Sequence, residues 1–125
     1  MAILTKRSTR KSTGGRYKSK LTKKLANLGS LSRYTKIGEK SVRVSRVMGA
    51  NKKVFLLKTN VVNVYDKKNN KYVKTKILSV IESPSNRHFV RRNILTKGAI
   101  IKTDLGNAKI TSRPGQEGTL NAVLV

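Results

Sequence analysis

The residue types that usually carry catalysis or bind metal ions are sparse in this chain. Its 125 residues include no Cys, a single His at position 88, and five carboxylates. Thiolate and disulfide chemistry is therefore excluded, and so is a metal site built from His alone. Asp66, Asp104 and Glu117 fall where turns are predicted, and carboxylates there commonly accept hydrogen bonds from backbone amides. Because no acid–base pair or metal constellation is visible, we expect no catalysis, no cofactor and no small-molecule substrate.

One short segment has the composition of a phosphate-binding loop. Gly14, Gly15 and Arg16 follow a run of Ser, Thr, Lys and Arg. A nucleotide-binding loop would need a preceding strand and a Lys-Ser or Lys-Thr pair at a fixed spacing, and the sequence has neither. The two glycines could instead let the backbone approach a sugar-phosphate chain closely while Arg16 reaches a phosphate. A flexible linker is the alternative interpretation.

Positive charge dominates the sequence. Lys and Arg number 29 against 5 Asp and Glu, which gives a formal net charge of +24. Such a chain binds polyanions, of which nucleic acid and an anionic membrane surface are the realistic classes. The longest apolar runs are four residues, and no wide amphipathic face with bulky anchors is evident, so we expect no membrane partner. No signal-peptide pattern follows the N-terminus, which favours the cytoplasm.

The cations are densest at the N-terminus. Residues 1–38 contain eleven Lys and Arg and no acid. With so few apolar residues, this stretch cannot bury enough surface to offset the entropy of ordering it. We therefore predict a basic arm that is mobile alone and becomes ordered on its partner. Leu21, Leu25 and Leu28 have helical spacing and allow a short helix over 19–28, although a solvated basic segment fits them equally well.

From residue 39 onward the sequence has the patterns of β-strands. Alternating or β-branched apolar runs occupy residues 41–44, 54–57, 61–65, 72–81, 99–103, 108–112 and 119–125. Polar turns make residues 61–81 and 99–112 two predicted hairpins, with Gly106 at positive φ in the second. Six to seven short strands predict a mostly β protein, with a small closed or nearly closed barrel over 39–125 and the arm extending from it.

Two connections within the predicted barrel carry cations. A Ser-Pro pair at 83–84 predicts the start of a short helical insertion near 84–92. Arg87 and Arg91 would share one face of it, with Arg92 adjacent, and three Arg without a nearby acid favour contact with a polyanion. The other connection is GANKK at 49–53, where Asn51 is predicted to take positive φ in a turn.

Aromatic residues are few, with two Phe and four Tyr. Phe55 is predicted to lie in the core, whereas Tyr17 and Tyr34 could stack on bases. This scarcity favours recognition of the backbone and shape of a folded RNA over reading of single-stranded sequence. The residues expected to bind RNA are Lys6, Arg7, Arg10, Lys11, Gly14, Gly15, Arg16, Tyr17, Lys18, Lys20, Lys23, Lys24, Arg33, Lys36, Lys52, Lys53, Asn86, Arg87, Arg91, Arg92, Asn93, Lys97 and Arg113.

Several of these segments also match a known family. They are RKSTGGR at 10–16, TKIGE at 35–39, GANKK at 49–53, VRRNILTKGAII at 90–101 after an Asn-Arg pair, and TSRPGQEG at 111–118 before NAVL. On these residues the chain resembles the archaeal and eukaryotic small-subunit ribosomal protein "eight-e" family, in its shorter archaeal form. One departure is Ala50, which stands where the family usually has a second Gly.

The resemblance implies a β-barrel on the small ribosomal subunit, bound to small-subunit (16S-type) rRNA, with its N-terminal arm threaded among RNA helices. It also implies neighbouring small-subunit ribosomal proteins as partners, no homo-oligomer, no catalysis and no cofactor. A free-standing architectural protein that binds RNA or DNA is the alternative. Such a protein should fold and persist alone, whereas a ribosomal protein should be stable only with its RNA.

Overall fold

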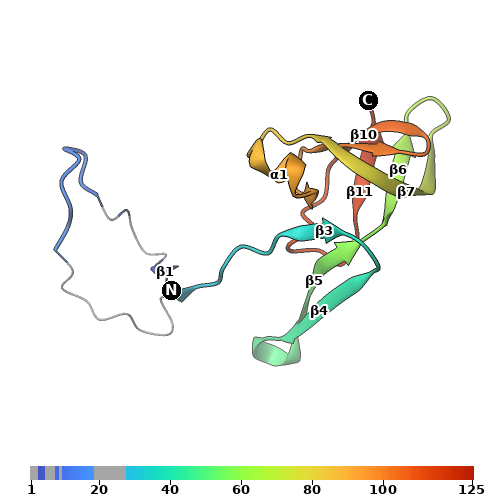
Figure 1. Cartoon of the computed structure of the whole chain (residues 1–125). Coiled ribbons are helices and arrows are strands. Elements are labelled where there is room, and N and C mark those ends of the chain that lie inside the picture. The colour runs from blue at the N-terminus through green and yellow to red at the C-terminus, as the bar shows by residue number, and fades with distance from the viewer. Residues whose placement is uncertain (1–2, 5–7, 9, 19–27) are drawn as a thin grey trace. The chain divides into compact units, whose positions relative to one another are not determined.

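A computed structural model describes residues 3–4, 8, 10–18 and 28–125 (Figure 1). The chain divides into two compact units, residues 1–32 and 33–125. In the first unit, the two-residue strands β1 (Ile3–Leu4) and β2 (Leu28–Gly29) pair antiparallel. Most of the predicted helix over 19–28 lies outside the described residues, and its last position, Leu28, belongs to β2.

Five strands of the second unit close into a barrel. They are β6 (Val61–Asp66), β7 (Lys71–Glu82), β9 (Ile100–Thr103), β10 (Gly106–Ile110) and β11 (Asn121–Leu124). The order around the barrel is β10-β11-β6-β7-β9, and β9 pairs back with β10. All neighbours are antiparallel except β11 and β6, which are parallel. Closure gives each of these strands a partner on both sides, so the barrel exposes no strand edge.

The remaining strands of this unit form a second sheet. They are β3 (Thr35–Ile37), β4 (Ser41–Arg46), β5 (Lys52–Thr59) and β8 (Ile94–Leu95), in the order β4-β5-β3-β8. Asn60 alone separates β5 from β6, so one nearly continuous stretch of chain passes from the sheet into the barrel. The antiparallel β4–β5 hairpin projects away from the barrel, and the 3₁₀ turn η2 (Met48–Ala50) forms its tip (Figure 1).

The mostly β class and the barrel are confirmed, but the barrel has five strands rather than six to seven. The predicted strands at 41–44 and 54–57 lie in the second sheet instead. The physical reason is visible in Val44, which is 58% exposed although it alternates with polar residues as a half-buried strand would. The projecting part of the hairpin extends beyond the core, so its apolar face is not covered as a barrel wall would be.

The structure places the boundary of the folded unit after Ser32 rather than at residue 38. Thr35 is only 1% exposed, and its hydroxyl donates a hydrogen bond to the carbonyl oxygen of Leu56 at 2.7 Å. Strand β3 also pairs with both β5 and β8. Residues 33–38 therefore belong to the second sheet, even though their charge resembles that of the arm.

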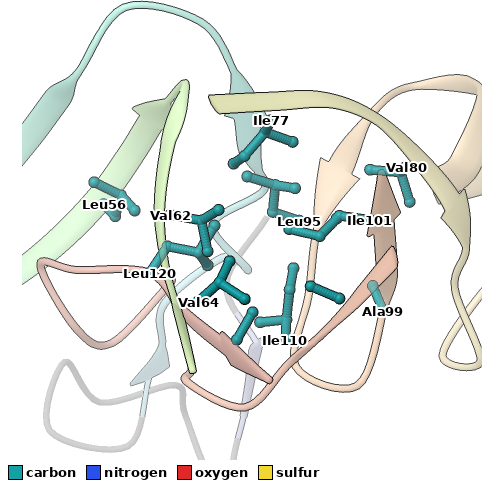
Figure 2. Close-up of a cluster of buried hydrophobic side chains, with 12 residues drawn as sticks. Leu56, Val62, Val64, Ile77, Val80, Leu95, Ala99, Ile101, Ile110 and Leu120 are labelled. Carbon is teal, nitrogen blue, oxygen red and sulfur yellow. The ribbon is translucent and has the colours of Figure 1, made fainter. Parts of the chain in front are cut away.

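The core lies inside the barrel and extends under the base of the hairpin (Figure 2). Period-two alternation directs Val62 and Val64 of β6 inward and leaves Asn63 and Tyr65 on the outer wall. Leu56 from β5 and Leu95 from β8 join the same cluster, which ties the second sheet to the barrel. The buried cluster comprises Leu56, Val62, Val64, Ile77, Val80, Leu95, Ala99, Ile101, Ala108, Ile110, Leu120 and Ala122.

Two predicted turns are confirmed. Between β6 and β7, the Asp66 carboxylate accepts hydrogen bonds from the Lys68 backbone N–H at 2.9 Å and from Asn69 Nδ2 at 2.7 Å. The Lys68 hydrogen bond is the main cause of a lowered pKa at Asp66, because it stabilises the charged form. Between β9 and β10, Gly106 takes φ of +126°, a conformation that costs residues with a Cβ.

The prediction that Asn51 takes positive φ is wrong. Asn51 has an extended backbone with φ of −67°, and the left-handed residues are Gly49 and Ala50, with φ of +72° and +60°. The η2 turn has already reversed the chain before Asn51, whose side chain instead donates to the Met48 carbonyl oxygen at 3.2 Å. The positive φ at Ala50 is a conformation that glycine adopts at lower cost than alanine.

The helical insertion exists but begins later than the Ser-Pro pair. The helix α1 spans His88–Arg91, and the Asn86 side-chain oxygen accepts a hydrogen bond from the His88 N–H at 2.9 Å. Ser83 is buried, and its hydroxyl lies 3.1 Å from that of Ser85 and 3.4 Å from that of Thr96. Ser83 therefore links the loop before α1 to Thr96, the residue that directly follows β8, and does not cap the helix.

The junction between sheet and barrel predicts a clear contrast between two adjacent leucines. Leu56→Ala removes a 1% exposed side chain and should lower the free energy of unfolding by about 2–5 kcal/mol. Leu57→Ala, at a 36% exposed neighbour, should cost at most about 1 kcal/mol. Urea unfolding of the RNA-free chain measures both, and equal losses would contradict the packing described for this junction.

Candidate nucleic-acid interface

Three Arg residues gather around α1, between β7 and β8. Arg87, Arg91 and Arg92 are all exposed. The helix is held by an aromatic contact, since the ring centroids of Phe89 and Tyr34 lie 5.4 Å apart. The Arg92 guanidinium carbon lies 5.7 Å from the centroid of the Tyr34 ring, within the range of a cation–π contact. The structure thus brings together Tyr34 and the Arg cluster, which are far apart in sequence.

Arg33 occupies a different position, at the base of the hairpin. Its guanidinium carbon lies 3.6 Å from the centroid of the Phe55 ring. Phe55 is buried, as predicted, at 8% exposure, and Arg33 covers it while remaining partly exposed. This stacking holds the planar, positively charged guanidinium against an apolar face. One face of the Arg33 guanidinium is therefore committed to packing, and its N–H donors lie at the rim of that contact.

The β4–β5 hairpin carries a second concentration of charge. Residues 40–58 contain six cations and no acid. The hairpin cations, all exposed, are Lys40, Arg43, Arg46, Lys52, Lys53 and Lys58. Arg46 and Lys52 are directly opposite each other in the register, an arrangement that destabilises a hairpin on its own. Met48, at the tip, is 91% exposed.

The hairpin cations lie on both faces of the two-stranded ribbon. Side chains of successive strand residues point to opposite faces, and directly opposite residues share a face. Arg46 and Lys52 therefore lie on one face, and Arg43 and Lys53 on the other. Only Lys52 and Lys53 were predicted from sequence as RNA-binding residues. Arg43 and Arg46 were missed because single cations are common within any solvent-exposed strand; the absence of acids over 40–58 is the signal that could have found them.

The glycine-containing segment of the first unit forms a tight turn. The Lys11 N–H donates to the Gly15 carbonyl oxygen at 2.8 Å, and the Gly14 N–H donates to that of Lys11 at 3.0 Å. Arg10 Nη1 donates to the Gly14 carbonyl oxygen at 2.9 Å. Gly14 has φ of +84°, and a Cβ at either glycine would meet no atom of the described chain closer than 3.7 Å. Intramolecular crowding therefore does not explain Gly15.

The other predicted contact residues fall into three groups. Arg16, Tyr17, Lys18, Lys36, Lys97 and Arg113 are exposed. Asn86 and Asn93 are also exposed, but their side-chain oxygens accept backbone hydrogen bonds, from His88 at 2.9 Å and from Val80 at 3.3 Å, so these two residues shape the α1 loop. Lying outside the described residues are Lys6, Arg7, Lys20, Lys23 and Lys24.

The cations of this surface have no intramolecular counter-charge. Within residues 3–4, 8, 10–18 and 28–125, no Lys or Arg forms an ion pair. Asp66, one of the few carboxylates, accepts a hydrogen bond from the Lys68 backbone N–H within the β6–β7 turn. In the same part of the chain, no group of three or more His, Cys, Asp and Glu is arranged to hold a metal ion. The arrangement suits the binding of an extended polyanion at several separated points.

Among the residues that the structure describes, no helix is long and apolar enough to cross a bilayer.

Comparison with known proteins covers almost the entire sequence. The family model described as ribosomal protein S8e matches residues 4–125. A protein of Methanococcus aeolicus is 47% identical over 126 residues, which span 100% of this chain and 98% of the relative. A protein of Methanocorpusculum labreanum is 50% identical over 95% of each chain, and one of Nanoarchaeum equitans is 46% identical over 95% of this chain and 94% of its own.

All three relatives are named small ribosomal subunit protein eS8. The similarity includes the turn at 10–16, the basic hairpin, the α1 loop and the barrel, so it does not rest on one shared module. Since both the family model and these relatives span nearly the whole chain, the chain belongs to the ribosomal protein S8e family.

Proposed function

We propose that this protein is a structural component of the small ribosomal subunit, where it binds small-subunit rRNA by neutralising phosphate charge and fixing RNA shape. The observation that carries the proposal is the match, over nearly the full length of both chains, to relatives named small ribosomal subunit protein eS8. Membership of a ribosomal protein family indicates a structural rather than a catalytic role. The ribosome would supply both kinds of expected partner, the rRNA and neighbouring ribosomal proteins.

The charge distribution supports neutralisation of phosphates as the mechanism. Cations that form no intramolecular ion pair release condensed counterions when they reach RNA phosphates, and this release favours binding. The same cations repel one another in the free chain, where the net charge is +24. Binding to RNA therefore gains an attraction and removes a repulsion at once.

The hairpin supports a role in holding two RNA segments together. It projects from the barrel (Figure 1), and its two faces carry different cations, Arg46 and Lys52 on one and Arg43 and Lys53 on the other. A ribbon with positive charge on both faces can lie between two phosphate chains that would otherwise repel each other. A surface with cations on one face only would bind a single segment.

The α1 loop supports a second, more localised contact. Guanidinium groups bind phosphate through two parallel hydrogen bonds, which fixes orientation as well as adding affinity. The contact between Arg92 and the Tyr34 ring restricts this side chain before RNA arrives, so less conformational entropy is lost on binding. Arg87 and Arg91 are exposed beside it and extend the same surface.

Sedimentation of the native protein tests the proposal. A tagged copy expressed in its own cells should remain with small subunits through a sucrose gradient after a high-salt wash. A free-standing architectural RNA- or DNA-binding protein would be released by the wash and spread over unrelated nucleic acid. Recovery at the top of the gradient, with small subunits intact, would contradict a structural ribosomal role.

Salt dependence should show how many cations engage phosphates. If about ten cations contact phosphates, the logarithm of the association constant should fall with the logarithm of salt concentration with a slope of about −7 to −9. Filter binding of the full chain to small-subunit rRNA across a salt series measures this slope. A slope near about −2 would mean that most of the charges only cover the surface.

Removing two adjacent Arg residues of the α1 loop should weaken RNA binding without unfolding the protein. Arg91→Ala combined with Arg92→Ala should reduce the magnitude of the salt slope by roughly 2, because about one counterion is released per phosphate contact. The melting temperature of the free chain should barely change, since both side chains are exposed.

A matched variant controls for net charge. Lys102→Ala with Lys109→Ala also removes two exposed cations, from β9 and β10, outside the predicted RNA-binding set. This control should retain a slope close to that of the unsubstituted protein. An equal loss in both double variants would mean that the total charge, rather than the α1 surface, determines binding.

A further inference from the structure

The outer wall of the barrel contains a hollow that the cationic surfaces do not include. It lies over β7, β6 and β11 and has a volume of about 560 Å³, within the range typical of small-ligand sites. The residues that matter for its chemistry are Asn63, Tyr65, Tyr72, Lys74, Asn121 and Val123. We refer to it below as the tyrosine groove.

Strand pairing arranges these six residues in two rows across the three strands. Tyr65 is opposite Tyr72 on one side and Val123 on the other, which makes an apolar and aromatic row. In the same way, Asn63 is opposite Lys74 and Asn121, which makes a polar row. The rows are two residues apart along each strand, or about 7 Å. The register of a rigid barrel therefore sets both rows side by side.

The aromatic row offers an open stacking surface. The ring centroids of Tyr65 and Tyr72 lie 4.9 Å apart, and the Tyr65 hydroxyl donates to Asn70 Oδ1 at 2.8 Å. Tyr65 is thus held by the β6–β7 turn, and Tyr72 packs against it. Tyr72 nevertheless remains 75% exposed, far more than a tyrosine whose role is to cover the barrel would be.

The polar row offers hydrogen-bonding groups and a charge. Asn63 Nδ2 donates to Asn121 Oδ1 at 3.0 Å, which fixes the two amides against each other. The remaining atoms, Asn63 Oδ1 and Asn121 Nδ2, form no hydrogen bond within the described part of the chain. The pair therefore presents one acceptor and one donor in the same row as Lys74.

We propose that the tyrosine groove binds a single unpaired base of the RNA, an inference that rests on the proposed function. Unpaired bases are recognised by stacking on aromatic side chains and by hydrogen bonds to their polar edges. A base stacked on Tyr72 can turn its edge toward the amide pair, while Lys74 reaches the phosphate of the same nucleotide. The lysine and the positive field of the whole chain favour this anionic occupant over a segment of a neighbouring protein.

The proposal adds base recognition to an interface that otherwise contacts the RNA backbone. The test therefore uses three short RNA duplexes that differ at one position: fully paired, with one bulged adenosine, and with a bulged abasic nucleotide. The full-length chain should bind the adenosine bulge about tenfold more tightly than the abasic bulge, as expected for one stacked base. The abasic and fully paired duplexes should bind with similar affinity and a steep salt slope.

Substitutions locate this preference. Tyr72→Ala should abolish the tenfold preference and leave binding of the abasic and paired duplexes unchanged. Tyr72→Phe should retain it, since the ring is kept. Leu105→Ala removes another exposed large side chain, in the β9–β10 turn outside the groove lining, and should also retain the preference. Melting of each free variant establishes that it is folded.

Two results would overturn the proposal. One is equal binding of the adenosine and abasic bulges by the unsubstituted chain; with a steep salt slope intact, that result leaves the proposed function standing. The other is a preference that survives Tyr72→Ala. A groove that holds a segment of a neighbouring protein gives the second result or shows no preference at all, and either outcome excludes a base from the groove.

Discussion

Mutual repulsion between closely spaced cations is the constraint on which this structure depends. The sequence carries 29 Lys and Arg against five carboxylates, and no ion pair relieves them in the described part of the chain. The opposing force within the protein is the burial of apolar side chains in one cluster (Figure 2). The neutralising charge must come from outside, and for a member of a ribosomal protein family the natural source is rRNA.

The barrel meets this constraint by separating its two tasks along the same strands. Alternation places Val62 and Val64 in the core and Asn63 and Tyr65 on the outer wall. The residues of the proposed tyrosine groove are therefore mounted on paired strands rather than on loops, which keeps their spacing rigid. The β4–β5 hairpin differs from the barrel, because almost all residues of β4 are exposed and its outer part buries little apolar surface. Its base is held by Leu56 in the barrel core and by Arg33 stacked over Phe55.

Local chemistry and family resemblance made much of this predictable from sequence. The two hairpins at 61–81 and 99–112 and the turns at Asp66 and Gly106 follow from residues close together in the chain. What could not be predicted depends on contacts between distant segments. The alternating pattern at 41–44 does not reveal whether its valines will be covered by the core or will project beyond it. The number of barrel strands was therefore overestimated.

The site shows the same division between local and distant information. Cationic residues can be identified directly from the sequence, and most of those that the structure describes are exposed. The tyrosine groove could not be predicted in this way, because Tyr65 and Tyr72 are separated by a turn and Asn121 lies far along the chain. Only the β6–β7 and β6–β11 registers bring them together. Ser83 was misassigned for a related reason, since its partner Thr96 lies thirteen residues away.

The most direct test of the central constraint is the salt dependence of thermal unfolding, measured with and without RNA. Added KCl shortens the screening length from about 10 Å at 0.1 M to about 3 Å at 1 M. In the free chain this should weaken repulsion, so the melting temperature should rise with salt. In the complex with small-subunit rRNA it should fall, because salt releases the RNA that stabilises the fold. A free-chain melting temperature that stays constant or falls with KCl would contradict the account.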